Sequence, residues 1–201
     1  MHLSHGVRRT SRGLRAAALT SVLLLGATAC SGAEGSAGGS SSAPAPDAKK
    51  ASVALNAGLK AHAAGELDEA TAEYKKTLTY DAKNKFAYYN LALIDASNGN
   101  YGLAEGNYRS ALESDAAYEP ALFNLAILRA GRDDATEAIS LYKRAVAANK
   151  KDAAAWLNLG LLQRSHGEKA AGNKAVLRAI ALNPALKDPQ EAADGKSARA
   201  R

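Results

Sequence analysis

Apolar and polar positions follow a helical rhythm from Ala51 onward, and the whole pattern recurs every thirty-four residues. Four units align without insertion or deletion: 51–84, 85–118, 119–152 and 153–186. Within each unit, apolar and small residues recur three or four positions apart in two stretches, which is typical of two amphipathic helices joined by a short turn. The pattern therefore predicts an all-α fold of four helix–turn–helix repeats.

Two kinds of position carry the repeat. A large residue stands at the twenty-fourth position of each unit, and small residues stand at the eighth, twentieth and twenty-seventh positions, where they let two helices approach closely. The large residues are Tyr74, Tyr108, Tyr142 and Val176. A glycine at the fifteenth position predicts a left-handed turn between the two helices. This glycine is Gly65, Gly99 or Gly167 in three units, whereas the third unit has Asp133.

The period and these positions resemble the tetratricopeptide repeat, over 136 of the 201 residues. The resemblance implies an α–α superhelix, a tetratricopeptide-repeat solenoid, in which each unit buries its apolar face against its neighbours. It also implies that the first helices of the units line a concave groove for protein or peptide partners. Residues 187–201 lack the apolar pattern of a fifth unit, so we expect a disordered tail or a short capping turn there.

The first 29 residues have the layout of an export signal: a basic region ends at Arg15, an apolar stretch runs from Ala16 to Ala27, and small residues precede Cys30. About a dozen apolar residues are too few for a membrane-spanning helix, which needs roughly twenty. The residues directly before Cys30, A-T-A, resemble a bacterial lipobox. This resemblance implies a lipoprotein signal peptide over 1–29 and a diacylglycerol anchor on Cys30; the alternative is an ordinary secretory signal with an incidental cysteine.

Residues 30–50 are rich in Gly, Ser, Ala and Pro, so we expect a flexible linker between the anchor and the repeats. The formal net charge of +6 comes mainly from residues 1–29, and without them 22 basic residues face 20 acidic ones. The repeats alone hold 16 basic and 15 acidic residues, so nucleic acid is not an expected partner. We expect a lipid-anchored protein on the extracytoplasmic side of the cell membrane.

The sequence shows no catalytic or metal-binding motif. Cys30 is the only cysteine, which excludes an intramolecular disulfide and a zinc site built on several thiolates. Only two histidines, His62 and His166, lie in the repeats, and they are three units apart. We therefore expect no enzyme, no metal and no cofactor.

The groove implied by the resemblance is the candidate functional surface. Asparagine occupies the sixth position of every unit, and its amide can donate to and accept from the backbone of an extended peptide. Asparagine is also frequent at this position in the family. The four asparagines therefore either bind the backbone of a peptide or are simply typical of the repeat. Apolar residues flank it at the fifth and ninth positions, which a soluble monomer rarely exposes as a strip. The predicted partner-binding residues are Asn56, Asn90, Asn124, Asn158, Tyr89, Leu93, Phe123 and Ile127.

Two functions fit this sequence. The first is a membrane-anchored scaffold or adaptor of the cell envelope that binds peptide or protein partners in the groove. The alternative is a structural, self-associating subunit whose groove is filled by its own chain or by a twin copy. The groove positions hold no rung of lysines or arginines, so a partner segment with little net charge is expected.

Overall fold

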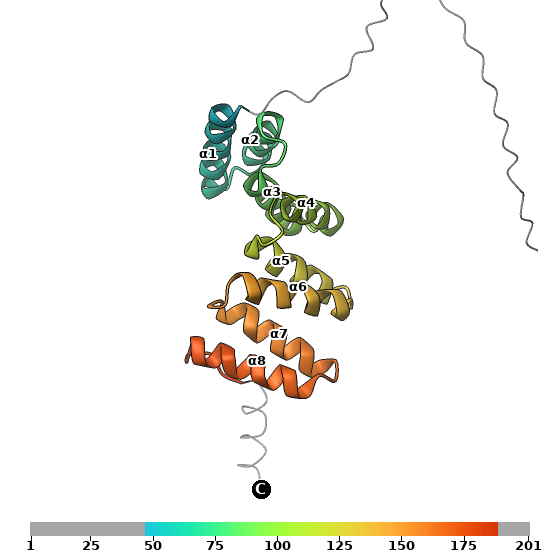
Figure 1. Cartoon of the computed structure of the whole chain (residues 1–201). Helices are drawn as coiled ribbons and strands as arrows, with labels where there is room; N and C mark the ends of the chain where they lie inside the picture. Colours follow the sequence, from blue (N-terminus) through green and yellow to red (C-terminus); the bar gives the residue numbers. More distant parts are fainter. Residues whose placement is uncertain (1–46, 189–201) are drawn as a thin grey trace, which may run out of the picture. The chain divides into compact units, whose positions relative to one another are not determined.

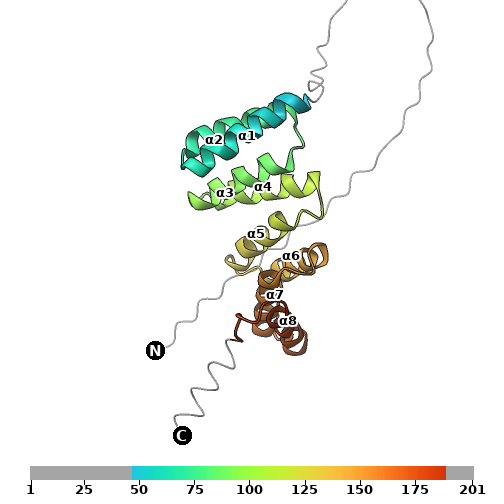
Figure 2. The ribbon, with the colours of Figure 1, turned by 90° about the vertical axis from the view of Figure 1, so that its left-hand side faces the viewer.

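The computed structural model describes residues 47–188, which form eight α-helices and no strand. The helices pair into four hairpins, one for each repeat, and the hairpins stack in chain order (Figures 1 and 2). The helices are α1 (Ala48–Ala64), α2 (Leu67–Tyr80), α3 (Lys85–Ser97), α4 (Tyr101–Ser114), α5 (Glu119–Ala130), α6 (Ala135–Ala148), α7 (Ala153–Ser165) and α8 (Lys169–Leu182).

The all-α fold expected from the period is confirmed. None of the helices between residues 47 and 188 combines the length and the apolar character that a bilayer span requires. The expected signal peptide, Cys30, most of the expected linker and residues 189–201 lie outside the described residues.

The turns inside the hairpins share one geometry. Gly65, Gly99 and Gly167 have φ values of 80°, 76° and 86°, the left-handed conformation predicted for them. Asp133 takes the same conformation with φ 60°, although a side chain makes this region costly for any residue but glycine. The amide of Asp134 donates to the Arg129 carbonyl at 3.0 Å, as in the other three turns. The third hairpin therefore turns like the others without a glycine.

Each hairpin is closed by one large residue of its second helix. Tyr74, Tyr108 and Val176 are at most 1% exposed and Tyr142 is 3% exposed, so the twenty-fourth position fills the space between the two helices as predicted. The small residues at the eighth, twentieth and twenty-seventh positions are all buried. In the fourth hairpin, glycines at two of these positions bring the backbones of α7 and α8 into direct contact.

Charged and aromatic side chains join the second and third repeats. The Arg129 guanidinium, 17% exposed, pairs with Glu105 of α4 and lies 2.9 Å from Glu137 Oε2 of α6. Arg109 Nη2 reaches the same Glu137 carboxylate at 2.9 Å. Tyr89 of α3 stacks edge to face on Tyr118, the last residue of repeat two and the one directly before α5, with ring centroids 5.4 Å apart. These contacts bind neighbouring hairpins together beyond their shared apolar core.

The C-terminal face of the stack is held by a buried ion pair. After α8 the chain turns back, and Asp188 accepts two hydrogen bonds of 2.7 Å from the Arg164 guanidinium of α7. Both side chains are 8% exposed. The contact ties Asp188 to α7, in the stretch from residue 187 onward where we expected a disordered tail or a short capping turn.

A pair of carboxyl groups makes the stack sensitive to pH. Burial and a hydrogen bond with Asp152 raise the pKa of Glu119 from 4.5 to about 7. Because folding raises the pKa of Glu119, the contribution of this carboxyl group to stability is fully present below its unfolded pKa. This contribution is lost as the pH rises through the folded pKa of about 7. Solvent screening reduces the cost of the charged carboxylate at high pH. We therefore expect Glu119→Gln to raise the free energy of unfolding by roughly 1 kcal/mol at pH 8 and to leave it almost unchanged at pH 4.

Urea unfolding of both proteins at these two pH values tests this expectation. An equal change at both values would contradict it. Glu119 is the residue to replace, because Asp152 accepts hydrogen bonds from the amides of Ala154 and Ala155 and caps α7.

Candidate functional site: a hollow between the first helices of repeats three and four

The surface formed by α1, α3, α5 and α7, here called the first-helix surface, carries the predicted partner-binding residues. Between α5 and α7 this surface sinks into a hollow of about 500 Å³, here called the α5–α7 hollow. Its lining contains no charged side chain and consists of Ile127, Ala130, Tyr142, Asn158, Leu161, Leu162 and Ser165. The structure thus brings Ile127 and Asn158, two of the predicted residues, to one site.

The four asparagines differ in how far their amides are engaged. Asn90 donates to the Phe86 carbonyl of its own helix at 2.8 Å. Asn124 donates both to the Pro120 carbonyl at 2.9 Å and to the Tyr89 hydroxyl at 3.3 Å, which uses both of its N–H groups. Among the described residues, the side chains of Asn90 and Asn124 accept no hydrogen bond, so their carbonyl oxygens remain free as acceptors.

The remaining two asparagines lie at different depths. Asn158 is half-buried in the hollow, and its hydrogen bond to the Tyr142 hydroxyl lowers the pKa of that group against the larger effect of burial, which raises it to about 12. Tyr142 is therefore neutral and keeps its proton at physiological pH. Asn56 is exposed on α1 and has no side-chain hydrogen bond within the described part of the chain.

The predicted apolar anchors are less exposed than the repeat pattern suggests. Tyr89 and Phe123 are half-buried, because their rings pack on Tyr108 and Tyr142 with centroids 6.0 and 5.8 Å apart. Leu93 is also half-buried against the core. Ile127 alone among these four is openly exposed, at 45%. The two aromatic rings thus contribute to stability as well as to the surface.

The hollow lies between repeats three and four, whereas the predicted apolar anchors come from repeats two and three. In the fourth repeat the fifth position is Leu157, where the second and third repeats have Tyr89 and Phe123. Two lining residues, Ala130 and Leu162, stand at positions that the repeat pattern does not assign to the groove. Tyr142 was assigned only to the core, although its hydroxyl end reaches the hollow. No feature of the period marks these residues, because they are set by how two neighbouring hairpins meet.

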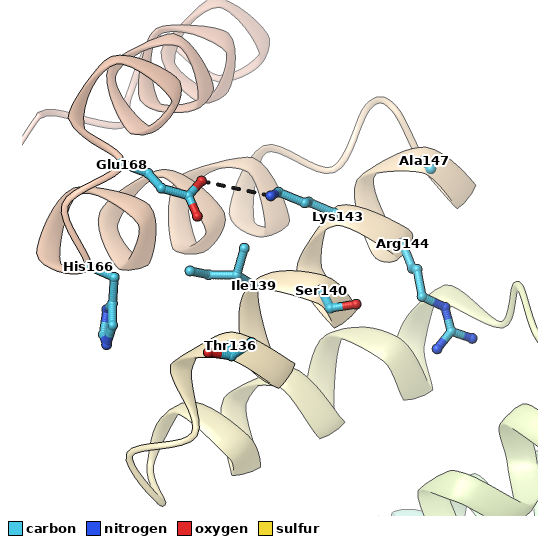
Figure 3. A pocket seen from close by; sticks show the side chains of 8 residues that line it. All are labelled: Thr136, Ile139, Ser140, Lys143, Arg144, Ala147, His166 and Glu168. Carbon is cyan, nitrogen blue, oxygen red and sulfur yellow. Dashed lines mark ion pairs between the residues drawn. The ribbon is translucent and has the colours of Figure 1, made fainter.

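A second pocket, of about 610 Å³, lies between α6 and the turn from α7 to α8 (Figure 3). Lys143 reaches across it toward Glu168, with 3.8 Å between Nζ and Oε2. Ser140, His166 and Glu168 line it together, but no hydrogen bond joins them. His166 Nδ1 instead contacts Ser165 Oγ and the Leu162 carbonyl, both at 3.1 Å, at the end of α7. This pocket therefore lacks the linked nucleophile and base of a hydrolase.

The described residues contain no group of three potential metal ligands. His62 lies half-buried, with Nδ1 3.3 Å from the Tyr74 hydroxyl. It thereby serves the packing of the first hairpin. The chemistry that the site offers is apolar contact and hydrogen bonding.

The fold is shared with solved structures of tetratricopeptide-repeat proteins. A crystal structure of MamA superimposes with a TM-score of 0.61 at 19% identity, over 69% of this chain and 81% of that one. PilF of Pseudomonas aeruginosa gives 0.59 at 22% identity, over 68% and 62%. The first TPR of Spaghetti (RPAP3), bound to an HSP90 peptide, gives 0.55 at 23% identity, over 60% and 95%.

No protein-family model matches the sequence, and the search of curated proteins also finds no match. The structural likeness establishes the fold: the eight helices of residues 47–188 form a tetratricopeptide-type solenoid.

Proposed function

We propose that the protein is a membrane-anchored adaptor that holds a protein or peptide partner on its first-helix surface, at the α5–α7 hollow. The observation that carries this proposal is the hollow itself, an uncharged depression of about 500 Å³ with an exposed isoleucine at its edge. The RPAP3 neighbour supports the peptide-binding role, because that protein of the same fold is bound to an HSP90 peptide.

The lining indicates the kind of partner. Ile127 and Leu161 offer apolar contact, and each side chain that a partner buries there contributes roughly 1.5–3 kcal/mol. Asn158 and Ser165 offer hydrogen bonds, each with a net contribution of about 0.5–1.5 kcal/mol. Because the hollow has no charged side chain, the partner segment is apolar, and its binding depends little on salt.

The membrane part of the proposal rests on Cys30 and the residues before it. Two or three acyl chains on the mature N-terminus hold a protein at a membrane, whereas one chain is only marginal. The Gly- and Ser-rich linker then lets the repeats reach partners on the extracytoplasmic side.

Replacing Cys30 by serine tests the anchor. We expect the variant to lose acylation, to remain an uncleaved precursor and to incorporate no labelled palmitate, whereas the wild type does. Normal cleavage of the variant, with unchanged membrane retention, would contradict the lipoprotein assignment.

A matched pair of exposed aliphatic residues tests the hollow. Ile127→Ser should reduce capture of the partner from solubilised membranes by about tenfold, since it removes one apolar anchor. Leu103, which is 62% exposed on α4, is the control, and Leu103→Ser should leave capture unchanged. Tyr89→Ala and Phe123→Ala are less suitable, because both rings also pack on buried tyrosines. The reverse result, with loss at Leu103 alone, would refute the hollow as the binding site.

A further inference from the structure

The opposite surface, formed by α2, α4, α6 and α8 and here called the second-helix surface, carries two corresponding grooves. The α4–α6 groove has a volume of about 270 Å³ and is lined by Arg109, Leu112, Glu113, Leu125, Glu137, Leu141 and Arg144. The α6–α8 groove has about 510 Å³ and is lined by Lys143, Val146, Trp156, Leu159, Gln163, Ala171, Lys174, Ala175 and Arg178. Six lining residues of the first groove have their counterparts in the second thirty-four positions later.

The two grooves differ in what fills them. In the α4–α6 groove, Leu141 covers the apolar floor and Glu137 neutralises Arg109, with 2.9 Å between Oε1 and Nη2. The residues in the corresponding places of the α6–α8 groove are Ala175 and Ala171. The second groove thus lacks both the leucine side chain and the carboxylate, which accounts for its larger volume.

Two of the three cations of the α6–α8 groove have no carboxylate partner among the described residues. Lys174 and Arg178 form no ion pair among residues 47–188, and Lys143 has only Glu168 at 3.8 Å, between exposed side chains. Helix α8 contains three basic residues and no acidic one. Glu168 lies on the turn before α8 and lines the neighbouring pocket (Figure 3), and it accepts a hydrogen bond of 2.7 Å from Gln163 of the groove.

The floor of this groove is apolar and fixed. Val146, Leu159 and Ala175 are 3–5% exposed. Trp156 stands where the α5 helix has Leu122, and its indole N–H donates to the Lys150 carbonyl at 3.1 Å. A rigid apolar floor with cations around it is complementary to an apolar side chain that has a carboxylate beside it.

We propose that the α6–α8 groove binds an acidic amphipathic helix of a partner protein, which supplies from outside the two groups that Glu137 and Leu141 supply in the α4–α6 groove. Those two residues are four positions apart on α6, so the partner helix carries glutamate and leucine with the same spacing. The leucine lies over Trp156, and the carboxylate lies among Lys143, Lys174 and Arg178. This surface is separate from the α5–α7 hollow and serves a partner of different charge.

The single tryptophan of the chain lies in this groove and reports binding directly. The probe is an alanine-based helical peptide without tryptophan, of the fourteen-residue length of α6, with glutamate and leucine four positions apart. Added to the purified full chain, it should cause a saturable shift in Trp156 fluorescence. Peptides with glutamine for glutamate, or alanine for leucine, should bind about tenfold more weakly. Binding by the parent peptide should also weaken with added salt.

Variants of the protein decide the location. Lys174→Glu/Arg178→Glu should weaken binding by about tenfold or more, and Ala171→Glu/Ala175→Leu, which turns this groove into a copy of the closed one, should abolish it. Ile127→Ser, on the first-helix surface, should leave it unchanged, which separates this test from that of the α5–α7 hollow. Absence of a saturable shift, or equal binding by the charge-reversed variant, would overturn the proposal. The proposal would also be overturned if vesicles of anionic phosphatidylglycerol caused an equal shift in Trp156 fluorescence and this shift persisted in Lys174→Glu/Arg178→Glu.

Discussion

Replacing Gly172 by alanine is expected to destabilise the protein by about 3 kcal/mol, because the new methyl group has no space between α7 and α8. A Cβ atom at this position would lie 2.6 Å from the Gly160 carbonyl oxygen and 2.9 Å from the Arg164 amide nitrogen. Both neighbours are backbone atoms, so no side-chain rotation relieves the contact. The two helices must move apart, which opens the packing around Val176.

The matched control is Gly106, which also lies within a helix. A Cβ atom there meets nothing within 4 Å. Alanine at this position should stabilise the protein by about 0.5–1 kcal/mol, because it reduces the conformational freedom of the unfolded chain. Urea unfolding followed by circular dichroism measures both changes. Effects of the same sign would contradict the close backbone contact of the fourth hairpin.

Asp188→Ala should destabilise the protein by about 3 kcal/mol, because it removes the carboxylate that accepts two hydrogen bonds from the buried Arg164 guanidinium. Melting temperature and resistance of the C-terminal hairpin to proteolysis should both fall. In the double variant Arg164→Met/Asp188→Ala most of the loss should be recovered, since the buried charge is then absent.

An exposed ion pair provides the comparison for this variant. Lys76 contacts Glu73 at 3.0 Å with half of its side chain exposed, and Lys76→Ala should change stability by less than about 1 kcal/mol. If Asp188→Ala unfolds no more easily than Lys76→Ala, the contact between Asp188 and Arg164 does not hold the end of the stack.

The hairpins could be predicted from the sequence because each depends on local spacing. The thirty-four-residue period located the units, the glycines located three of the turns, and the residue at position twenty-four identified the buried side chain of each hairpin. These features depend on residues close together in one unit, and a helical period reports them directly.

Features that depend on neighbouring units could not be predicted in the same way. Position five lies on the outer side of a single hairpin, yet the half-buried Tyr89 is also reached by the next hairpin, where Asn124 of α5 donates a hydrogen bond to its hydroxyl. The pair between Arg164 and Asp188 joins a helix to a coil beyond the last repeat, where no period applies. The total numbers of basic and acidic residues are nearly equal, and these totals do not show where the charges pair. In the α4–α6 groove Arg109 pairs with Glu137, whereas Lys174 and Arg178 of the α6–α8 groove form no ion pair among the described residues.

The most direct test of the proposed function is photocrosslinking in intact cells. A photoreactive amino acid is placed at position 127, in the α5–α7 hollow, or at position 103, which is exposed on the second-helix surface. We predict a discrete crosslinked protein from position 127, found in the membrane fraction and lost when Leu161→Ser is added, and none from position 103. A crosslink from position 103 with none from position 127 would show that the partner does not bind at the α5–α7 hollow.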